Sequence, residues 1–459
     1  MKYIINALVL CIVVILAMVS CKDGANTKQK QVINYEQYAD SVIQDFKFAW
    51  EAYKKYAWGH DALKPLTKTY HDWYGVSLLM TPVDSYDTMV LMGLNEEADE
   101  AKKLILDSLS FNKDIYVQHF EITIRLLGGL LSAYLLDGDP KFLELATDLA
   151  NRMLPVFNSP TGMPYVFVNL KTGKTKGEIN NPAEIGTLLL EYGTLSKLTG
   201  NPIYYDKAKK AIMALMEKSS DIGLVGTLID VNTGKWINTE CHISGMIDSF
   251  FEYLLKTSLL FKDEEIESAW KKTITGINNF MKHKTENGLW YSHVDMFSGK
   301  RLKTQVGALD AFFPAVLCLA GNIDDAREFN ESLFSLWEKY GIIPEQYDYM
   351  NDTIISAAYY LRPECIESAY YLYNYTKDEK YLRMGVRYYS SIVKYCKTGE
   401  AFSHLESVVT KQKEDAMESF FFAETLKYLY LLFDQGKSLK FNDVIFNTEA
   451  HPILIEKIQ

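Results

Sequence analysis

Acidic side chains interrupt four apolar stretches of this 459-residue chain, each of which has the residue spacing of a helix. The stretches hold Glu121 with Arg125 in "HFEITIRLLGGLL", Asp248 in "MIDSFFEYLLK", Glu364 with Glu367 in "LRPECIES", and Glu418 with Glu424 in "MESFFFAETLKYL". Charged residues are almost never fully buried unless they are paired or bind a metal. Any one of these acids is more often a helix cap or a surface ion pair, but four such clusters in one fold predict an acidic cavity.

The chemistry that suits such a cavity is carbohydrate chemistry. Carboxylates bind sugar hydroxyls, and an aromatic ring such as Phe420, between Glu418 and Glu424, can stack on a pyranose face. Two carboxyl groups that flank a glycosidic oxygen are also the basic requirement for hydrolysis of a glycosidic bond. The acids therefore indicate a sugar-binding site that could hydrolyse its ligand.

A second group of reactive side chains lies close to the C-terminus, in "VIFNTEAHPI". Terminal segments usually carry loose polar residues and fray into solvent. This one places a hydroxyl, a carboxylate and an imidazole (Thr448, Glu449 and His451) between apolar neighbours. The pattern indicates that the segment packs against the rest of the fold.

The elements that must position these groups are helices. From about residue 35 to residue 433, apolar residues recur at three- and four-residue steps. Residues 133–146, 195–208 and 372–385 share one pattern. In each, a helix ends at Gly or Lys, and an Asp or Asn caps a new helix, which predicts αα-hairpins. Segments 223–236 and 288–300 have the pattern of β-hairpin loops. Because the helix pairs are unevenly spaced, they favour one closed α/α toroid over a stacked solenoid of the TPR type.

Charge and composition narrow the class of protein. The formal net charge is −11, whereas nucleic-acid binding needs a surplus of Lys and Arg, so no nucleic-acid partner is expected. Hydrophobic residues make up 48% of the chain, enough for a large core. No Pro/Ser-rich linker follows residue 35, so residues 35–459 are predicted to form one catalytic domain.

The N-terminal residues have the layout of a secretory signal, with Lys2, an apolar stretch and Ser20 before Cys21. Residues 1–21 end in "AMVSC", which is similar to a bacterial lipobox, where Cys21 becomes the lipidated first residue; an uncleaved membrane anchor is the alternative. Residues 22–34 then form a polar tether. The remaining cysteines are too scattered for a metal site, but an oxidising compartment would allow a disulfide; they are Cys241, Cys318, Cys365 and Cys396.

Seven stretches, in chain order, resemble the successive motifs of glycoside hydrolase family 47, the calcium-dependent, inverting α-mannosidases. They are "YAWGHDALKP", "PVDSYDTMVLMGL", "FEITIRLLGGLLSAY", "IDSFFEYLLK", "LRPECIES", "SFFFAETLKYLYLLF" and "FNTEAHP". The resemblance implies an all-α (α/α)7 barrel with short inserted β-hairpins, one end of which is plugged by a C-terminal hairpin. It also implies that Thr448 binds Ca²⁺ through its hydroxyl and its carbonyl.

The resemblance assigns roles to individual residues. Glu121 matches a general acid that acts through a water, Glu364 matches the general base, and Asp248 matches a third catalytic carboxylate. Residues expected around the bound mannose and the waters of the ion are Arg125, Glu184, Arg362, Glu367, Phe420, Glu424 and Glu449. Ca²⁺ accepts six to eight hard oxygens, so one Thr suffices only if nearby acids hold its waters.

Two positions depart from the processing enzymes of the endoplasmic reticulum that belong to this family. Met246 stands where those enzymes carry Arg, two residues before the catalytic Asp, and Ala308 stands where they carry His. "LDAFFPA" and "GLVGTLIDVNTGKW" look more like the ER-degradation-enhancing branch, whereas "YAWGHDALKP" looks more like the processing branch. Linkage preference is therefore not fixed by the resemblance.

The leading hypothesis is an exo-acting α-mannosidase, with α-1,2 linkages as the expected target, on a monomer lipid-anchored in a Gram-negative cell envelope. The first alternative is a non-catalytic, calcium-dependent mannose-binding envelope protein, which would have no need of Glu121 and Asp248. The second is a structural α-solenoid, which leaves the C-terminal segment unexplained.

Overall fold

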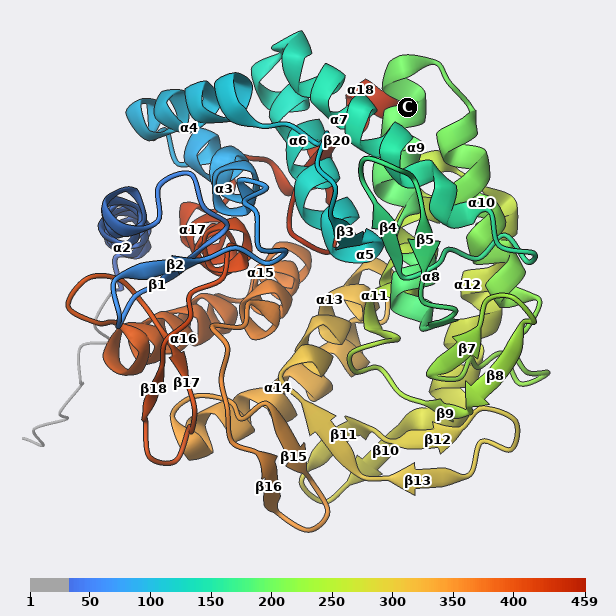
Figure 1. Ribbon diagram of the computed structural model, residues 1–459. Helices are drawn as coiled ribbons and strands as arrows, with labels where there is room; N and C mark the ends of the chain where they lie inside the picture. Colours follow the sequence, from blue (N-terminus) through green and yellow to red (C-terminus); the bar gives the residue numbers. More distant parts are fainter. Residues whose placement is uncertain (1–32) are drawn as a thin grey trace, which may run out of the picture. The chain divides into compact units, whose positions relative to one another are not determined.

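Two concentric rings of helices surround a common axis (Figure 1). The computed structural model describes residues 33–459, so the expected leader and nearly all of the tether lie outside the described residues. Residues Glu36–Gln459 form one compact unit. The all-α (α/α)7 barrel expected from the sequence is confirmed, since seven helix pairs alternate around the axis in the part of the chain described.

The inner ring consists of α3 (Met80–Leu91), α6 (Gly128–Asp137), α9 (Leu189–Thr199), α11 (Asp248–Phe261), α13 (Phe313–Leu319), α15 (Glu364–Thr376) and α17 (Leu426–Asp434). Each inner helix contacts the next in this order, and the turn that leads into α17 contacts α3, which closes the ring. Nearly every residue of α3 and every residue of α17 is buried. A helix that is buried on all sides is largely apolar, and the buried charged residues Asp84, Asp87 and Lys427 of these two helices are paired with one another or with the C-terminal hairpin.

The outer ring consists of α2 (Tyr35–Tyr56), α4 (Asn95–Ser108), α7 (Pro140–Met153), α10 (Ile203–Met216), α12 (Glu264–Gly276), α14 (Ile323–Tyr340) and α16 (Glu379–Cys396). These helices are amphipathic and bury one stripe; on α16 it includes Tyr381 and Tyr388. The predicted αα-hairpins are confirmed, because α6 ends at Gly138 (φ 84°) and Asp139 caps α7 by accepting a bond from the Lys141 amide.

Short antiparallel strands join the helix pairs. They are β1 (Ala62–Lys64), β2 (Thr69–His71), β3 (Tyr116–Gln118), β4 (Phe167–Asn169), β5 (Thr175–Lys176), β6 (Ile179–Asn180), β7 (Leu228–Asp230), β8 (Lys235–Asn238), β9 (Glu240–Cys241), β10 (Lys282–Thr285), β11 (Gly288–Tyr291), β12 (His293–Asp295), β13 (Arg301–Lys303), β14 (Gln305–Gly307), β15 (Gln346–Asp348), β16 (Thr353–Ser356), β17 (His404–Leu405) and β18 (Lys413–Glu414). The predicted segment 223–236 holds β7 and the start of β8, which pair as a hairpin. The segment 288–300 holds β11 and β12, but they do not pair with each other, because β11 pairs with β10 before the segment and β12 with β13 after it.

The last hairpin, β19 (Val444–Phe446) with β20 (Pro452–Leu454), packs against the inner ring and forms the predicted plug. Its apolar residues Ile445 and Ile453 join a cluster with Leu190 and Tyr253 of the ring. The last hairpin can approach α6 this closely because Gly128 has no side chain: a Cβ there would lie 2.6 Å from the side-chain amide nitrogen of Asn447.

Short helices and helical turns complete the chain. They are α5 (His119–Ile122), α8 (Pro182–Gly186) and α18 (Ile455–Ile458), the 3-10 turns Leu154–Phe157, Leu309–Phe312 and Phe441–Asp443, and the π-helical turns Thr123–Leu127, Ile277–Met281 and Phe421–Thr425. The run His119–Asp137 is long and apolar enough to span a membrane, but it is 78% buried inside the barrel, so it is a core helix.

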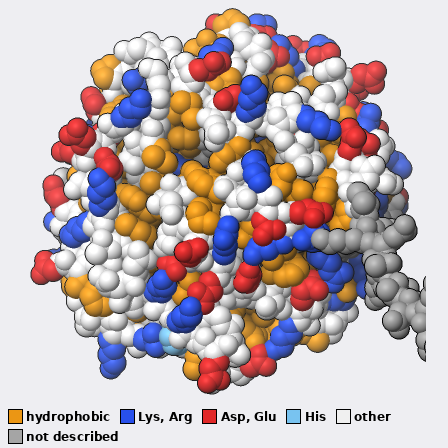
Figure 2. Space-filling view, turned by 180° about the vertical axis from the view of Figure 1, so that it is seen from behind, with side chains coloured by type: hydrophobic (Ala, Val, Ile, Leu, Met, Phe, Trp, Pro, Cys, Tyr) orange, Lys and Arg blue, Asp and Glu red, His pale blue; other side chains and the backbone are white. Residues whose placement is uncertain are grey.

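The surface and the cysteines fit the composition. On the face shown in Figure 2, Lys and Arg side chains are interspersed with Asp and Glu rather than gathered into one basic patch. Within the described chain, Cys241, Cys318, Cys365 and Cys396 are buried free thiols, so the disulfide considered from the sequence does not form.

Candidate active site

A cavity of about 310 Å³ lies at the centre of the inner ring. Every predicted site residue lines it, and these are Glu121, Arg125, Glu184, Asp248, Arg362, Glu364, Glu367, Phe420, Glu424, Thr448 and Glu449. Ligand pockets usually measure roughly 300–1,000 Å³, so this one suits a single sugar ring. Glu418 does not line the cavity; it accepts a bond from the Trp73 indole (2.9 Å).

The ends of the inner helices bring these side chains together. Asp248 is the first residue of α11, and Glu364 and Glu367 stand on the first turn of α15. Arg125 and Glu424 lie on the π-helical turns that precede α6 and α17. Such turns insert one extra residue per turn and are frequent at functional sites.

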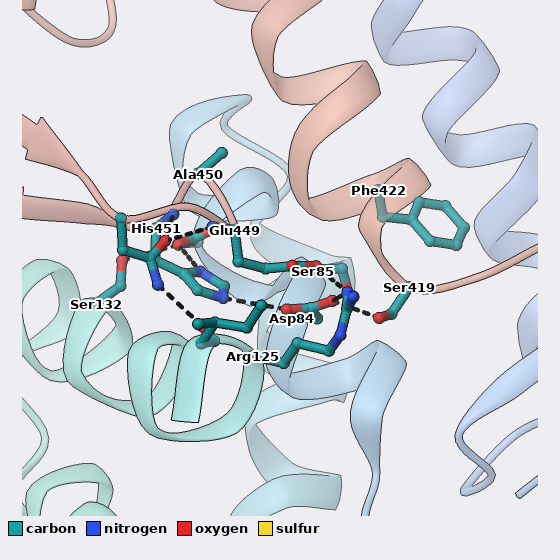
Figure 3. Close-up of polar contacts among 12 residues, drawn as sticks. Asp84, Ser85, Arg125, Ser132, Ser419, Phe422, Glu449, Ala450 and His451 are labelled. Atoms are coloured by element: carbon teal, nitrogen blue, oxygen red, sulfur yellow. Dashed lines mark hydrogen bonds and ion pairs between the residues drawn. The ribbon is translucent and has the colours of Figure 1, made fainter. Parts of the chain in front are cut away.

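Arg125 connects one wall of the cavity with its floor (Figure 3). Its Nε donates to Glu121 Oε2 at 2.9 Å, and its Nη1 donates to Glu449 of the plug. The guanidinium also lies 5.7 Å from the centre of the Phe420 ring, within the range of a cation–π contact. A buried guanidinium that touches two carboxylates fixes both of them in place.

His451 anchors the plug beneath the cavity (Figure 3). Its two ring nitrogens lie 2.7 Å from Asp87 Oδ2 and 3.1 Å from Asp84 Oδ1, and all three side chains are buried. Burial opposes the charge, but the two carboxylates raise the pKa of His451 above its ordinary value. Lys427 lies 2.7 Å from Asp87 and donates to the Ala450 carbonyl at 2.7 Å. The plug is therefore held by buried ion pairs.

Burial sets the protonation of the cavity acids. It raises the pKa of Asp248 and of Glu364 to about 7, and that of Glu367 to about 8 despite the charge of Lys256. Burial and the neighbouring Glu364 raise the pKa of Glu424 well above its usual range. Perturbed carboxyls that converge in one cavity are typical of acid–base catalysis.

The remaining predicted residues are fixed by their neighbours. Glu184 Oε1 accepts bonds from Gln118 (2.9 Å) and Asn181 (3.0 Å), and its other oxygen is buried with no partner in the described chain. Arg362 forms an ion pair with Glu345 at 2.7 Å and faces the cavity beside Glu364.

A second cavity of about 470 Å³ adjoins the first, and the two share Gly245, Met246 and Leu309. Met246 is 49% exposed and has a positive φ of 78°, which is unusual for a residue other than glycine. Ala308 is buried and lines neither cavity, while Asp310 accepts a bond from the Ser244 hydroxyl (2.5 Å). Of the two departures noted in the sequence, only Met246 therefore lines a cavity.

The cavity floor has the oxygen chemistry that a hard cation requires. The Thr448 amide donates to Tyr253 Oη, but its hydroxyl and carbonyl oxygens have no hydrogen-bond partner among the described residues. One oxygen of Glu364 is buried without a partner as well. No group of three His, Cys, Asp or Glu side chains in the described chain is placed to bind one metal ion directly, so the acids fit a role in holding the waters of an ion.

Several functional residues were not singled out from the sequence. Gln118, Asn181 and Glu252 line the cavity, and Asp84 and Asp87 hold His451. Glu252 and the two aspartates carry the same signal as the predicted acids, a charge inside an apolar helix. Gln118 and Asn181 stand at element ends in text of mixed polarity, and no pattern there marks them.

Known proteins resemble the whole of this unit. The chain is 38% identical to "Alpha-mannosidase I MNS5" of Arabidopsis thaliana over 92% of this chain and 78% of the relative. It is 37% identical to "ER degradation-enhancing alpha-mannosidase-like protein 2" of Homo sapiens over 91% and 77% of the two chains. The solved "alpha-1,2-mannosidase from Trichoderma reesei" superposes with a TM-score of 0.85 at 29% identity, over 92% of this chain and 99% of the other. The profile of Glycosyl hydrolase family 47 matches residues 45–455, and the chain belongs to this family.

Proposed function

We propose that this protein is an exo-acting, Ca²⁺-dependent α-mannosidase that removes terminal mannose, with α-1,2 linkages as its main target. The observation that carries the proposal is the central cavity, because acids from five other elements line it and the plug closes its floor with Thr448 and Glu449. A closed floor suits removal of one terminal sugar at a time. The names of the relatives, two α-mannosidases and one alpha-mannosidase-like protein, support the choice of sugar.

In the proposed reaction, Glu364 accepts a proton from the water that attacks the anomeric carbon. Glu121 and Asp248 deliver a proton to the glycosidic oxygen, and Asp248, whose pKa is about 7, can still hold one near neutral pH. Phe420 and Arg125 form the wall against which the ring is placed. Ca²⁺, held by the two free oxygens of Thr448, would supply a hard cationic centre for sugar hydroxyls.

A non-catalytic mannose-binding protein is not favoured. Capture of mannose would need the floor residues, but it would give no reason for Glu121, Asp248 and Glu364 to line the same cavity. We also propose that the mature chain is a monomer attached by a lipid at Cys21 to a Gram-negative cell envelope. The "AMVSC" ending of residues 1–21 supports this localisation.

The first sugar released should be β-mannose. A base that delivers water to the face opposite the leaving group inverts the anomeric centre. A panel of mannobioses of defined α-linkage, followed by proton NMR from the first minutes, would show both the linkage cleaved and the anomer formed. Early α-mannose would refute the inverting mechanism, and no cleavage of any α-linked mannobiose would refute the function.

Met246→Arg should narrow the choice among branched mannose oligosaccharides. The wild-type side chain offers no hydrogen bond at the junction of the two cavities, whereas a guanidinium there could bind sugar hydroxyls, each such bond contributing about 1–3 kcal/mol. The measurement is the ratio of kcat/KM values for isomeric glycans, with Met246→Leu as the control that keeps the site apolar. The expectation is contradicted if the wild-type enzyme already cleaves one branch exclusively and Met246→Arg gives the same ratio of kcat/KM values.

A further inference from the structure

The amide of Thr448 is held by a chain of two buried side chains. The Thr448 N–H donates to the Tyr253 hydroxyl at 3.2 Å, and this hydroxyl donates to Glu191 Oε1 at 2.6 Å. Tyr253 stands on α11 and Glu191 on α9, so the chain runs from the plug through two inner helices. Neither Tyr253 nor Glu191 lines the catalytic cavity.

The hydrogen bonds among Thr448, Tyr253 and Glu191 can run in only one direction. A phenolic hydroxyl has a single hydrogen, and because Glu191 accepts it, the lone pairs of the oxygen are left for the Thr448 amide. The exposed fractions are 0% for Tyr253 and 1% for Glu191, so water cannot easily replace either partner. Asn447 reinforces the arrangement, since its side-chain amide donates to Glu191 Oε1 (2.8 Å) and to the Ile124 carbonyl (2.9 Å).

We propose that Tyr253 and Glu191 are positioning residues that fix the Thr448 peptide so that its two free oxygens stay at the cavity floor, ready for Ca²⁺. The inference rests on the proposed metal site, and it deepens that site by naming residues that act without touching the ion. Groups that orient a metal ligand typically contribute about 10–100-fold to metal affinity. Glu191 acts here as a hydrogen-bond acceptor and not as a remote negative charge.

Tyr253→Phe removes the hydroxyl and little else, and it should weaken Ca²⁺ binding by about tenfold or more. Calorimetric titration of the metal-free protein with Ca²⁺ alone gives the Kd directly, and turnover should recover once Ca²⁺ is raised in proportion. Tyr204→Phe is the matched control, because Tyr204 is also buried and its hydroxyl donates to Asn151 at 2.8 Å, far from the plug in the outer ring. Both variants lose the hydrogen bond of a buried tyrosine hydroxyl, but only the first should change the Kd.

Glu191→Gln distinguishes a role of Glu191 as a hydrogen-bond acceptor from a role of its negative charge. Its side-chain carbonyl can still accept from Tyr253 and Asn447, so Ca²⁺ affinity should stay within about threefold of the wild type, whereas a role through charge would lower it as much as Tyr253→Phe does. If the wild type and Tyr253→Phe bind Ca²⁺ equally well, this inference is wrong, but the proposed metal site remains. If the wild type binds no Ca²⁺, the proposed metal site itself is wrong.

Discussion

Glu364→Gln lowers kcat by about 10²–10⁴-fold while the protein still binds mannose, because an amide keeps the shape of the side chain but cannot accept a proton from the attacking water. Glu364 stands at the first position of α15 and lines the cavity, and one of its oxygens is buried without a partner among residues 33–459. That free oxygen is the atom expected to take the proton. Steady-state rates on an α-linked mannobiose give the effect.

Calorimetric titration with mannose is the control for this variant, since an unchanged Kd excludes a collapsed site. Thermal unfolding should change little as well, because a pKa raised by burial to about 7 leaves the wild-type carboxyl only partly ionised near neutral pH, so the neutral amide removes little charge. A variant that keeps more than about a tenth of the wild-type rate contradicts the assignment of Glu364 as the general base.

Exhaustive treatment with EDTA should reduce turnover to background, and added Ca²⁺ should restore it. Removal of a cation from the floor leaves Glu364, Glu367 and Glu424 together without its compensating charge, and it frees the Thr448 oxygens for water. Mg²⁺ should restore less, because it is smaller and demands near-ideal octahedral geometry.

Thr448→Val tests the same site from the protein side. The substitution keeps the branched shape and the backbone carbonyl but removes the hydroxyl oxygen, so half-maximal activity should require more Ca²⁺. A titration of activity against Ca²⁺ concentration measures this shift. The calcium hypothesis is contradicted if the wild type and the variant both keep full activity after exhaustive EDTA treatment.

Most of the fold could be predicted because its two rings obey simple periodic patterns. The outer helices show one apolar stripe, as α16 does, and the inner helices are apolar on nearly every face, as α17 is. Strands such as β5 and β17 were not predicted, since each has two residues and cannot display an alternating pattern. They form because the chain must turn between helix ends and pair its backbone there.

The acids of the site could be predicted for a related reason: a carboxylate inside an apolar helix needs a partner. The same signal was present at Glu191 in "LLLEYGTL" and at Lys427, yet neither was assigned a role. Which buried charges reach the ligand and which only support them depends on distances across the barrel, such as the contact between Lys427 and Asp87. Sequence spacing within one helix carries no information about those distances.

The position of the plug in the chain has a consequence for biosynthesis. The contact between Arg125 and Glu449 joins residues that are 324 positions apart. At a synthesis rate of about 5–20 residues per second, Arg125 is added to the chain roughly 16–65 s before its partner Glu449. During that interval Arg125, Asp84 and Asp87 have no plug to bind and must stay hydrated, so the centre of the ring can lose its water only after the final hairpin has been made. The nascent protein is therefore expected to stay inactive until the final hairpin docks, and the appearance of activity would report that step.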